Sequence, residues 1–255
     1  MHELISEWSN YSLSPPFILP KDLRILNSPD IIELHSGWES YISQSNFDSV
    51  TSSKLHTGLI PMPYIGNLEK SSIFILMLNP GLSATDYFGE YRIPEYRKAL
   101  VNNLKQRPES SFIFLNPEFS WHSGYQYWNK KLSKLITEFA KNKLCTYDES
   151  RNFFMEQISM IELLPYHSSH FKMKHKIISK IPSALLAKKF IHDSILPKAR
   201  NGNCIIVATR GMRYWDLPKH KNIITYERSE SRGAHLSPTT RGGSSILKFL
   251  SSKNL

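Results

Sequence analysis

Cysteine is almost absent from this 255-residue sequence, which contains only Cys145 and Cys204. Two cysteines are too few for a disulfide framework or for a cluster held by cysteine ligands. Long apolar runs are missing as well, because none approaches the roughly 20 residues of a membrane-spanning helix. The first residues, Met-His-Glu-Leu-Ile-Ser-Glu, lack the pattern of a signal peptide. We therefore expect a cytoplasmic protein without a membrane partner.

Acidic residues are scarce relative to basic ones: 22 Asp and Glu stand against 32 Lys and Arg, which gives a net charge of +10. An excess of positive charge favours a polyanionic partner, most simply a nucleic acid. The basic residues are scattered, with local density at 172–180 and 219–221. No feature of the sequence calls for an obligatory protein partner.

A strand buried on both faces is predicted at 73–78, where six consecutive apolar residues end at Asn79-Pro80-Gly81. Three further strands are predicted at 158–168, 204–208 and 223–226. Helices are predicted at 93–105, 128–139, 182–198 and 244–249. Strands that alternate with helices indicate a parallel sheet with helices on both faces. The sequence therefore predicts one α/β domain over residues 1–255, a three-layer α/β/α fold around a central four-stranded parallel sheet.

Residues 1–55 are predicted to form a helical N-terminal extension, ahead of the α/β core of residues 56–255. Within the extension, Ser28-Pro29 is a typical helix start. The apolar residues that follow recur at helical spacing: Ile31, Ile32, Leu34, Trp38 and Tyr41.

Two short motifs follow the first and last predicted strands, at the carboxyl ends where ligands bind in open α/β sheets. The first is Asn79-Pro80-Gly81, and the second is His235-Leu236-Ser237-Pro238. Each alone is equally an ordinary turn, or a loop histidine that bridges the backbone. Together, in this order and in a basic chain, they resemble the uracil-DNA glycosylase superfamily, whose members carry Asn-Pro-Gly and His-Pro-Ser-Pro motifs. The resemblance covers residues 60–250.

The resemblance implies a monofunctional DNA glycosylase, which hydrolyses the N-glycosidic bond of a base flipped out of the helix. Asn79 would hold the attacking water, and His235 would donate a hydrogen bond to the base oxygen on which negative charge collects. Asp86 would help to polarise the water; equally, it would cap the segment that follows it. Neither motif offers a lysine nucleophile, so we expect no cofactor. His122, His167 and His170 are alternative metal ligands, but the sequence lacks a helical His-x-x-x-His with nearby carboxylates, so we expect no metal.

Glu162 departs from the family pattern, because family members read the edge of uracil with an asparagine at this strand end. An ionised glutamate only accepts hydrogen bonds, whereas the exocyclic amino group of cytosine donates them. The resemblance therefore implies a modified cytosine as the substrate, such as the glucosylated hydroxymethylcytosine of phage DNA that antiviral members excise in prokaryotic cells. The alternatives are a structural Glu162 paired with Lys or Arg, a uracil or mismatch repair glycosylase, and a catalytically silent DNA-binding relative.

Further residues are assigned to the base and to DNA, double- or single-stranded, from their positions beside these motifs. The predicted base-binding residues besides Glu162 are Gly81, Tyr64, Phe88, Tyr166 and His167. The predicted DNA-binding residues are Pro63, Ser168, Arg210, Ser237, Thr239 and Arg241. Thr239 stands where family members carry a bulky wedge, so Arg241 is the candidate that fills the vacated stack, with a plain phosphate contact as its alternative.

Overall fold

The computed structural model describes residues 2–12, 14–44, 53–226 and 236–251. The chain forms two compact units, each built from three segments. Unit 1 comprises Met1–Tyr64, Leu78–Glu109 and Glu162–Ile191, and unit 2 comprises Ile65–Met77, Ser110–Ile161 and His192–Leu255. In the described part of the chain, no helix is long and apolar enough to cross a membrane.

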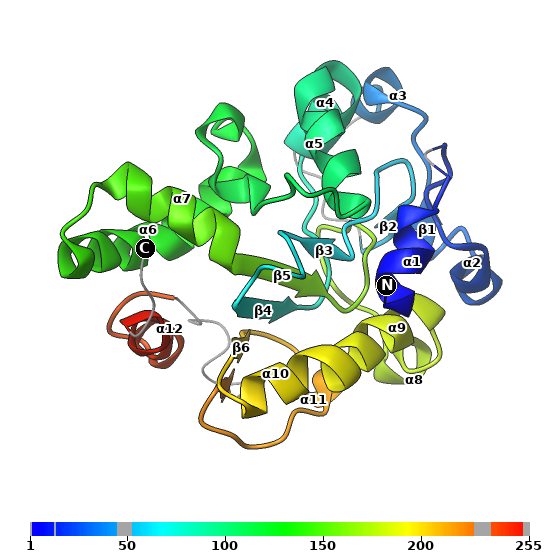
Figure 1. The fold of residues 1–255 in the computed structure, drawn as a ribbon. Coiled ribbons are helices and arrows are strands. Elements are labelled where there is room, and N and C mark those ends of the chain that lie inside the picture. Colours follow the sequence, from blue (N-terminus) through cyan, green and yellow to red (C-terminus); the bar gives the residue numbers. More distant parts are fainter. Residues whose placement is uncertain (1, 13, 45–52, 227–235, 252–255) are drawn as a thin grey trace. The chain divides into compact units, whose positions relative to one another are not determined.

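The main sheet has five strands in the order β3-β5-β4-β6-β7 (Figure 1). These strands are β3 (Tyr64–Ile65), β4 (Ile73–Met77), β5 (Ile158–Glu162), β6 (Ile205–Ala208) and β7 (Ile223–Thr225). The α/β class and the presence of the four predicted strands are confirmed, although the strand predicted at 158–168 ends at Glu162. The expectation of a four-stranded parallel sheet is corrected, because β3 adds a fifth strand and the sheet is mixed.

The apolar sequence of β4 explains its central place in the sheet. All five of its side chains are buried, as expected of a strand covered on both faces. Its neighbour β6 is parallel to it, with Ile73 opposite Ile205 and Leu76 opposite Ala208, and β7 is parallel to β6. The carboxyl ends of β4 and β6 therefore meet, and the Thr209 hydroxyl lies 3.1 Å from the Met77 sulfur.

Unit 2 also contains most of the long helices. The long helices of unit 2 are α6 (Ser123–Lys143), α7 (Tyr147–Gln157) and α12 (Arg241–Ser251), and its short helices are α10 (Leu196–Arg200) and α11 (Met212–Trp215). The predicted apolar stripe of α6 is buried, at Trp128, Leu132, Leu135, Ile136 and Phe139. Helix α12 packs against α6, β6 and β7. Two short 3₁₀ helices, η2 (Ile113–Leu115) and η3 (Pro117–Phe119), precede α6.

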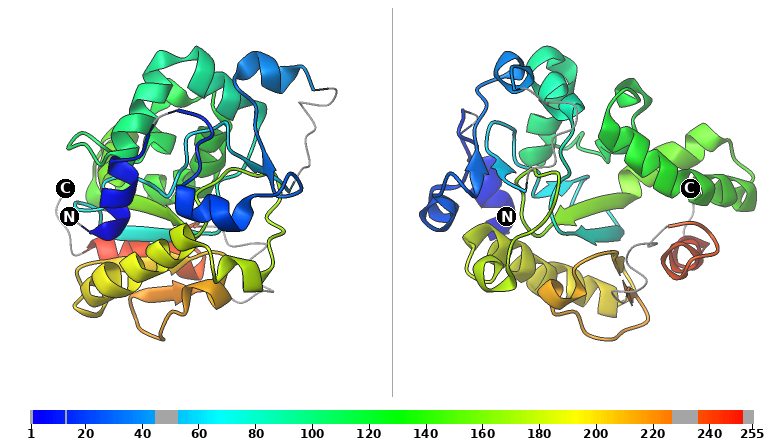
Figure 2. Two further views of the ribbon diagram at one scale, coloured as in Figure 1. Left: turned by 90° about the vertical axis from the view of Figure 1, so that its right-hand side faces the viewer. Right: turned by 180° about the vertical axis from the view of Figure 1, so that it is seen from behind.

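Unit 1 is built from shorter helices and a two-stranded parallel sheet. Its helices are α1 (Glu3–Ser9), α2 (Pro20–Leu26), α3 (Trp38–Ile42), α4 (Ala84–Arg92), α5 (Pro94–Leu104), α8 (His175–Ile178) and α9 (Pro182–Phe190). The small sheet pairs β1 (Ile32–Glu33) with β2 (Leu55–His56). Helices α1 and α2 pack against α9, as the views in Figures 1 and 2 show.

The predicted helix at 182–198 is divided into three parts. A π-helical turn at Ile191–Ile195 separates α9 from α10. Pro197 lies in the first turn of α10. Because proline has no N–H to donate, it interrupts the ladder of backbone hydrogen bonds and favours a break before it.

The helix predicted after Ser28-Pro29 is wrong over its first half. The Leu55 N–H donates to the Ile31 carbonyl at 2.7 Å, and the Thr57 N–H donates to the Glu33 carbonyl at 2.8 Å. These bonds hold Ile32–Glu33 as strand β1, and helix begins only after Gly37, at Trp38. Pairing with residues more than 20 positions away has thus overridden the local apolar spacing.

Buried Asp22 joins the N-terminal segment to the rest of unit 1. Its carboxylate accepts from the Tyr166 hydroxyl at 2.6 Å and from the backbone N–H of Ser183 at 2.9 Å. Ser183 lies in the first turn of α9, so Asp22 caps that helix from a distant part of the chain. Burial raises the pKa of Asp22, and the hydrogen bonds from Ser183 and Tyr166 oppose that shift.

We expect Asp22→Ala to lower the free energy of unfolding by about 2–4 kcal/mol, because it leaves the buried Tyr166 hydroxyl and Ser183 N–H without their acceptor. Urea denaturation followed by circular dichroism measures the change. Asp30→Ala is the matched control, since Asp30 is exposed. Equal stability of the two variants would contradict the cap.

Candidate functional site

Asn79 follows β4 by two residues, and three hydrogen bonds hold its side chain. Its Nδ2 donates to the Pro80 carbonyl at 2.9 Å, to the Tyr166 carbonyl at 3.3 Å and to the Ser168 hydroxyl at 2.8 Å. Two of these acceptors are carbonyl oxygens, which cannot donate, so the chemistry assigns the nitrogen rather than the oxygen to this side. The amide therefore has a defined orientation.

The Asn79 Oδ1 remains as the acceptor of this amide. It accepts no hydrogen bond from the residues that the structure describes, and Asn79 is half-buried. Gly81 is exposed, and a Cβ added to it would meet nothing within 4 Å. An acceptor of this kind beside an open turn is suited to holding a water molecule.

The turn at Asn79-Pro80-Gly81 is fixed by the segment after β5. The Leu164 N–H donates to the Leu78 carbonyl at 2.9 Å, and the Ser168 N–H donates to the Pro80 carbonyl at 3.2 Å. The buried ring of His167 spans two further carbonyls, with Nδ1 2.9 Å from the Gly81 oxygen and Nε2 3.3 Å from the Ile60 oxygen. His167 and Ser168, predicted to touch base and DNA, thus brace the turn through their side chains.

Asp86 has the capping role that the sequence left open. It is the third residue of α4, and its Oδ2 accepts from the Ser83 N–H at 2.7 Å and from the Ser83 hydroxyl at 3.0 Å. This is a capping box, which satisfies the first donors of the helix. Phe88, two residues further along, is 37% exposed and packs edge-on against Trp38.

Glu162 ends β5 and is 2% exposed. Its backbone N–H donates to the carbonyl of buried Pro63 at 3.0 Å. The extended Pro61–Pro63 loop is therefore paired with the end of β5, and its prolines lie inside unit 1 rather than on its surface.

The two predicted tyrosines are core residues. Tyr64 is fully buried, and its hydroxyl donates to the Leu104 carbonyl at 2.8 Å. Tyr166 is 1% exposed and directs its hydroxyl to Asp22. Burial raises the pKa of both hydroxyl groups. The structure thus gives both rings a packing role, and only the Tyr166 carbonyl reaches Asn79.

Four predicted DNA-binding residues lie in unit 2. Arg210 is exposed and follows β6. Burial lowers the pKa of Lys131 to about 8, and the positive charge of Arg210 contributes to this shift. The Ser237 carbonyl accepts from the Thr240 N–H and hydroxyl at 3.0 and 2.8 Å. The Thr239 hydroxyl lies 3.3 Å from that of Ser237.

Arg241 begins α12, and its guanidinium donates to the Thr225 carbonyl and lies 5.2 Å from the centre of the Tyr226 ring. These contacts direct the side chain to the end of β7. His235, the second predicted catalytic residue, lies outside the described residues.

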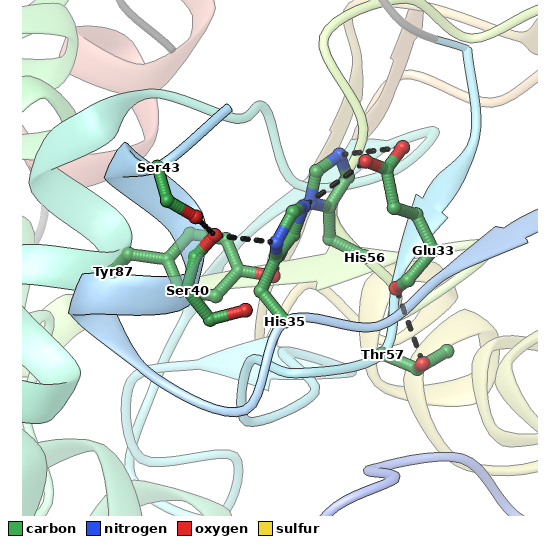
Figure 3. Close-up of polar contacts among 7 residues, drawn as sticks. All are labelled: Glu33, His35, Ser40, Ser43, His56, Thr57 and Tyr87. Carbon is green, nitrogen blue, oxygen red and sulfur yellow. Dashed lines mark hydrogen bonds and ion pairs between the residues drawn. The ribbon is translucent and has the colours of Figure 1, made fainter. Parts of the chain in front are cut away.

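A polar cluster in unit 1 was not predicted from the sequence (Figure 3). The Glu33 carboxylate faces two histidines, with Oε1 3.0 Å from His35 Nε2 and Oε2 4.0 Å from His56 Nε2. His35 Nδ1 lies 3.1 Å from the Ser40 carbonyl oxygen, and His56 Nδ1 lies 3.2 Å from the Tyr87 hydroxyl. Glu33 and His35 are two residues apart, a spacing that puts extended side chains on one face; nothing in the sequence signals that His56 joins them.

This cluster contains a strongly perturbed histidine. Burial lowers the pKa of His56 to about 4, opposed by the Glu33 carboxylate and reinforced by His35 and His167. Tyr87 is fully buried, and burial raises the pKa of its hydroxyl. Neutral His56 and neutral Tyr87 therefore share one hydrogen bond in the interior. Among the described residues, no group of three or more His, Cys, Asp or Glu side chains is arranged to hold a metal ion.

Comparison with known proteins gave no match to a family model, a curated protein or a solved structure. Fold and site thus define an α/β protein with a braced Asn79 turn after β4.

We expect the free energy of unfolding to fall as the pH is lowered from 7 to 4. The pKa of His56 is about 4 in the folded protein and 6.5 without its environment, so the unfolded state binds more protons in this window. The stability is complete above pH 6.5 and is lost towards pH 4, by on the order of 1–3 kcal/mol.

His56→Gln should remove this part of the pH dependence, whereas His175→Gln, at an exposed histidine, should retain it. Urea unfolding at a series of pH values measures both. A pH slope that is unchanged in His56→Gln would show that other groups cause it.

Proposed function

We propose that this protein is a monofunctional DNA glycosylase that flips a base and hydrolyses its N-glycosidic bond, leaving an abasic site. The orientation of the Asn79 amide carries the proposal. Its Nδ2 is held by acceptors of the chain, and its Oδ1 accepts nothing from the described residues. An amide is a weak base, but a fixed acceptor orients water for attack on a sugar carbon that gains positive charge.

The charge of the chain supports DNA as the partner. A net charge of +10 favours a polyanion. In the proposed mechanism His235 donates to the departing base, as the resemblance implies, and stabilises the negative charge that collects there. No metal or cofactor takes part in the proposal.

We further propose a modified cytosine as the base, with glucosylated hydroxymethylcytosine of phage DNA as the first candidate and antiviral defence as the purpose. Glu162 supports this choice. Its carboxylate is almost fully buried at the end of β5, and a carboxylate accepts from the N4 amino group that cytosine has and uracil lacks.

The first test is abasic-site formation on duplexes that carry uracil, cytosine, hydroxymethylcytosine or glucosylated hydroxymethylcytosine, scored by alkaline strand cleavage. Asn79→Ala should lower the single-turnover rate about 100- to 1,000-fold, because the water loses its acceptor. Ser168→Ala should lower the rate about 10- to 100-fold with little change in KM, because Asn79 loses one of its holders.

Ser179→Ala is the matched control, since Ser179 is exposed and, among the described residues, its hydroxyl bonds only to the Lys176 carbonyl of its own turn. Cleavage at uracil would identify the protein as a glycosylase that repairs uracil or mismatches. Absence of abasic sites on every substrate would refute the enzyme and leave a DNA-binding relative.

Glu162→Gln should lower kcat/KM on the modified cytosine about 10- to 100-fold, because the neutral amide is a poorer acceptor for the amino group. Activity on uracil should not fall in the same variant. The measurement is the ratio of kcat/KM on the modified cytosine to kcat/KM on uracil. If this ratio is the same in the variant and the wild type, Glu162 has a structural role and does not select the base.

A further inference from the structure

The longest stretch of the sequence without an acidic residue is 163–192, and it contains six lysines. The whole stretch lies in unit 1, apart from His192, and it includes the Tyr166–Ser168 segment that holds Asn79. The segment that holds Asn79 therefore continues into a stretch whose positive charge no acidic residue offsets.

Four of these lysines project from the surface. We call Lys172, Lys174, Lys176 and Lys180 the α8 lysines, since they lie on α8 and immediately beside it; all four are exposed. The apolar residues beside and between them are half-buried or buried: Phe171, Met173, Ile177 and Ile178. Within the described ranges none of the four lysines forms an ion pair. Their charges thus remain available to a partner.

A short path connects the α8 lysines to the Asn79 turn. The Ser168 hydroxyl accepts from Asn79 Nδ2 at 2.8 Å and donates to the His170 carbonyl at 3.3 Å. Lys172 is four positions after Ser168, so the Cα atoms of these two residues are at most about 14 Å apart, the length of a fully extended chain. Since nucleotides of one strand follow each other at about 3.4 Å along a duplex axis, this distance covers only a few phosphates.

We propose that the α8 lysines bind the phosphate backbone of the DNA strand whose target base is held at the Asn79 turn. This inference rests on the proposed function. Lysine ammonium groups act as point charges, which suits phosphates rather than the pattern of a base edge. The contacts position the strand on one side of the reacting nucleotide without reading its sequence.

The surface fits a nucleic acid better than a membrane or a protein. In the described chain, the large apolar side chains that are exposed include none between 170 and 180. A membrane-surface helix needs an apolar face that enters the lipid, and protein interfaces centre on buried aromatic anchors. Binding here is therefore electrostatic and strongly dependent on salt.

The test compares two triple variants of the full chain with equal loss of charge. One is Lys172→Gln, Lys174→Gln, Lys176→Gln; the control is Lys98→Gln, Lys141→Gln, Lys198→Gln, at exposed lysines of α5, α6 and α10. The probe is an unmodified, fluorescein-labelled 20-base-pair duplex, titrated by anisotropy between 50 and 300 mM NaCl. Circular dichroism checks that both variants are folded.

In the α8 variant, the negative slope of the logarithm of the association constant against the logarithm of the salt concentration should become shallower by about 2 to 3. Binding should weaken on the order of 100-fold at 100 mM salt. The control should keep the slope and the affinity of the wild type. A poly-glutamate chain should bind far more weakly than the duplex.

Equal effects in the two variants would show that only the net charge of the protein determines DNA binding, and would overturn the proposed surface. It would also be overturned if the α8 variant binds like the wild type, if the wild type does not bind DNA, or if poly-glutamate binds equally well. Binding that needs the α8 lysines, in a protein that forms no abasic sites, would uphold the surface and refute the glycosylase alone.

Discussion

The Asn79 amide nitrogen is the contact on which the proposed site depends. It donates to a carbonyl and a hydroxyl of the segment after β5, while its own turn accepts backbone hydrogen bonds from the same segment. Unlike charge pairs on the surface, these bonds are directional and half-buried, so they fix an orientation rather than merely add stability. The proposed chemistry requires this orientation, because the amide oxygen is useful only if the nitrogen is held elsewhere.

Much of the fold could be predicted because its signals are local. The buried strands β4 and β6 are continuous apolar runs, and the buried face of α6 recurs at helical spacing. What the sequence did not reveal depends on distant partners. Strand β1 exists because Leu55 and Thr57 donate to Ile31 and Glu33, and two-residue β3 is too short to leave a pattern.

The site could be predicted only in part, for a similar reason. The sequence predicted that Asn79 follows a buried strand. It also predicted that Asp86 either polarises the water or caps the next helix. The braces of the Asn79 turn were not predicted, because the Tyr166 and Gly81 carbonyls belong to the backbone and carry no sequence signature. Burial was equally hidden: Tyr64 and Tyr166 resemble stacking residues in the sequence, yet both rings are enclosed in unit 1.

Tyr166 uses its two ends for different purposes: its hydroxyl is bonded to Asp22 in α2, and its carbonyl accepts from Asn79. Tyr166 therefore links the N-terminal segment to the Asn79 turn. Substitutions at Asp22 and Asn79 should consequently show epistasis, their combined effect departing from the sum of the separate ones. A functional screen of this chain should therefore mark Asp22 in α2 as sensitive, although its contact with Asn79 runs through Tyr166.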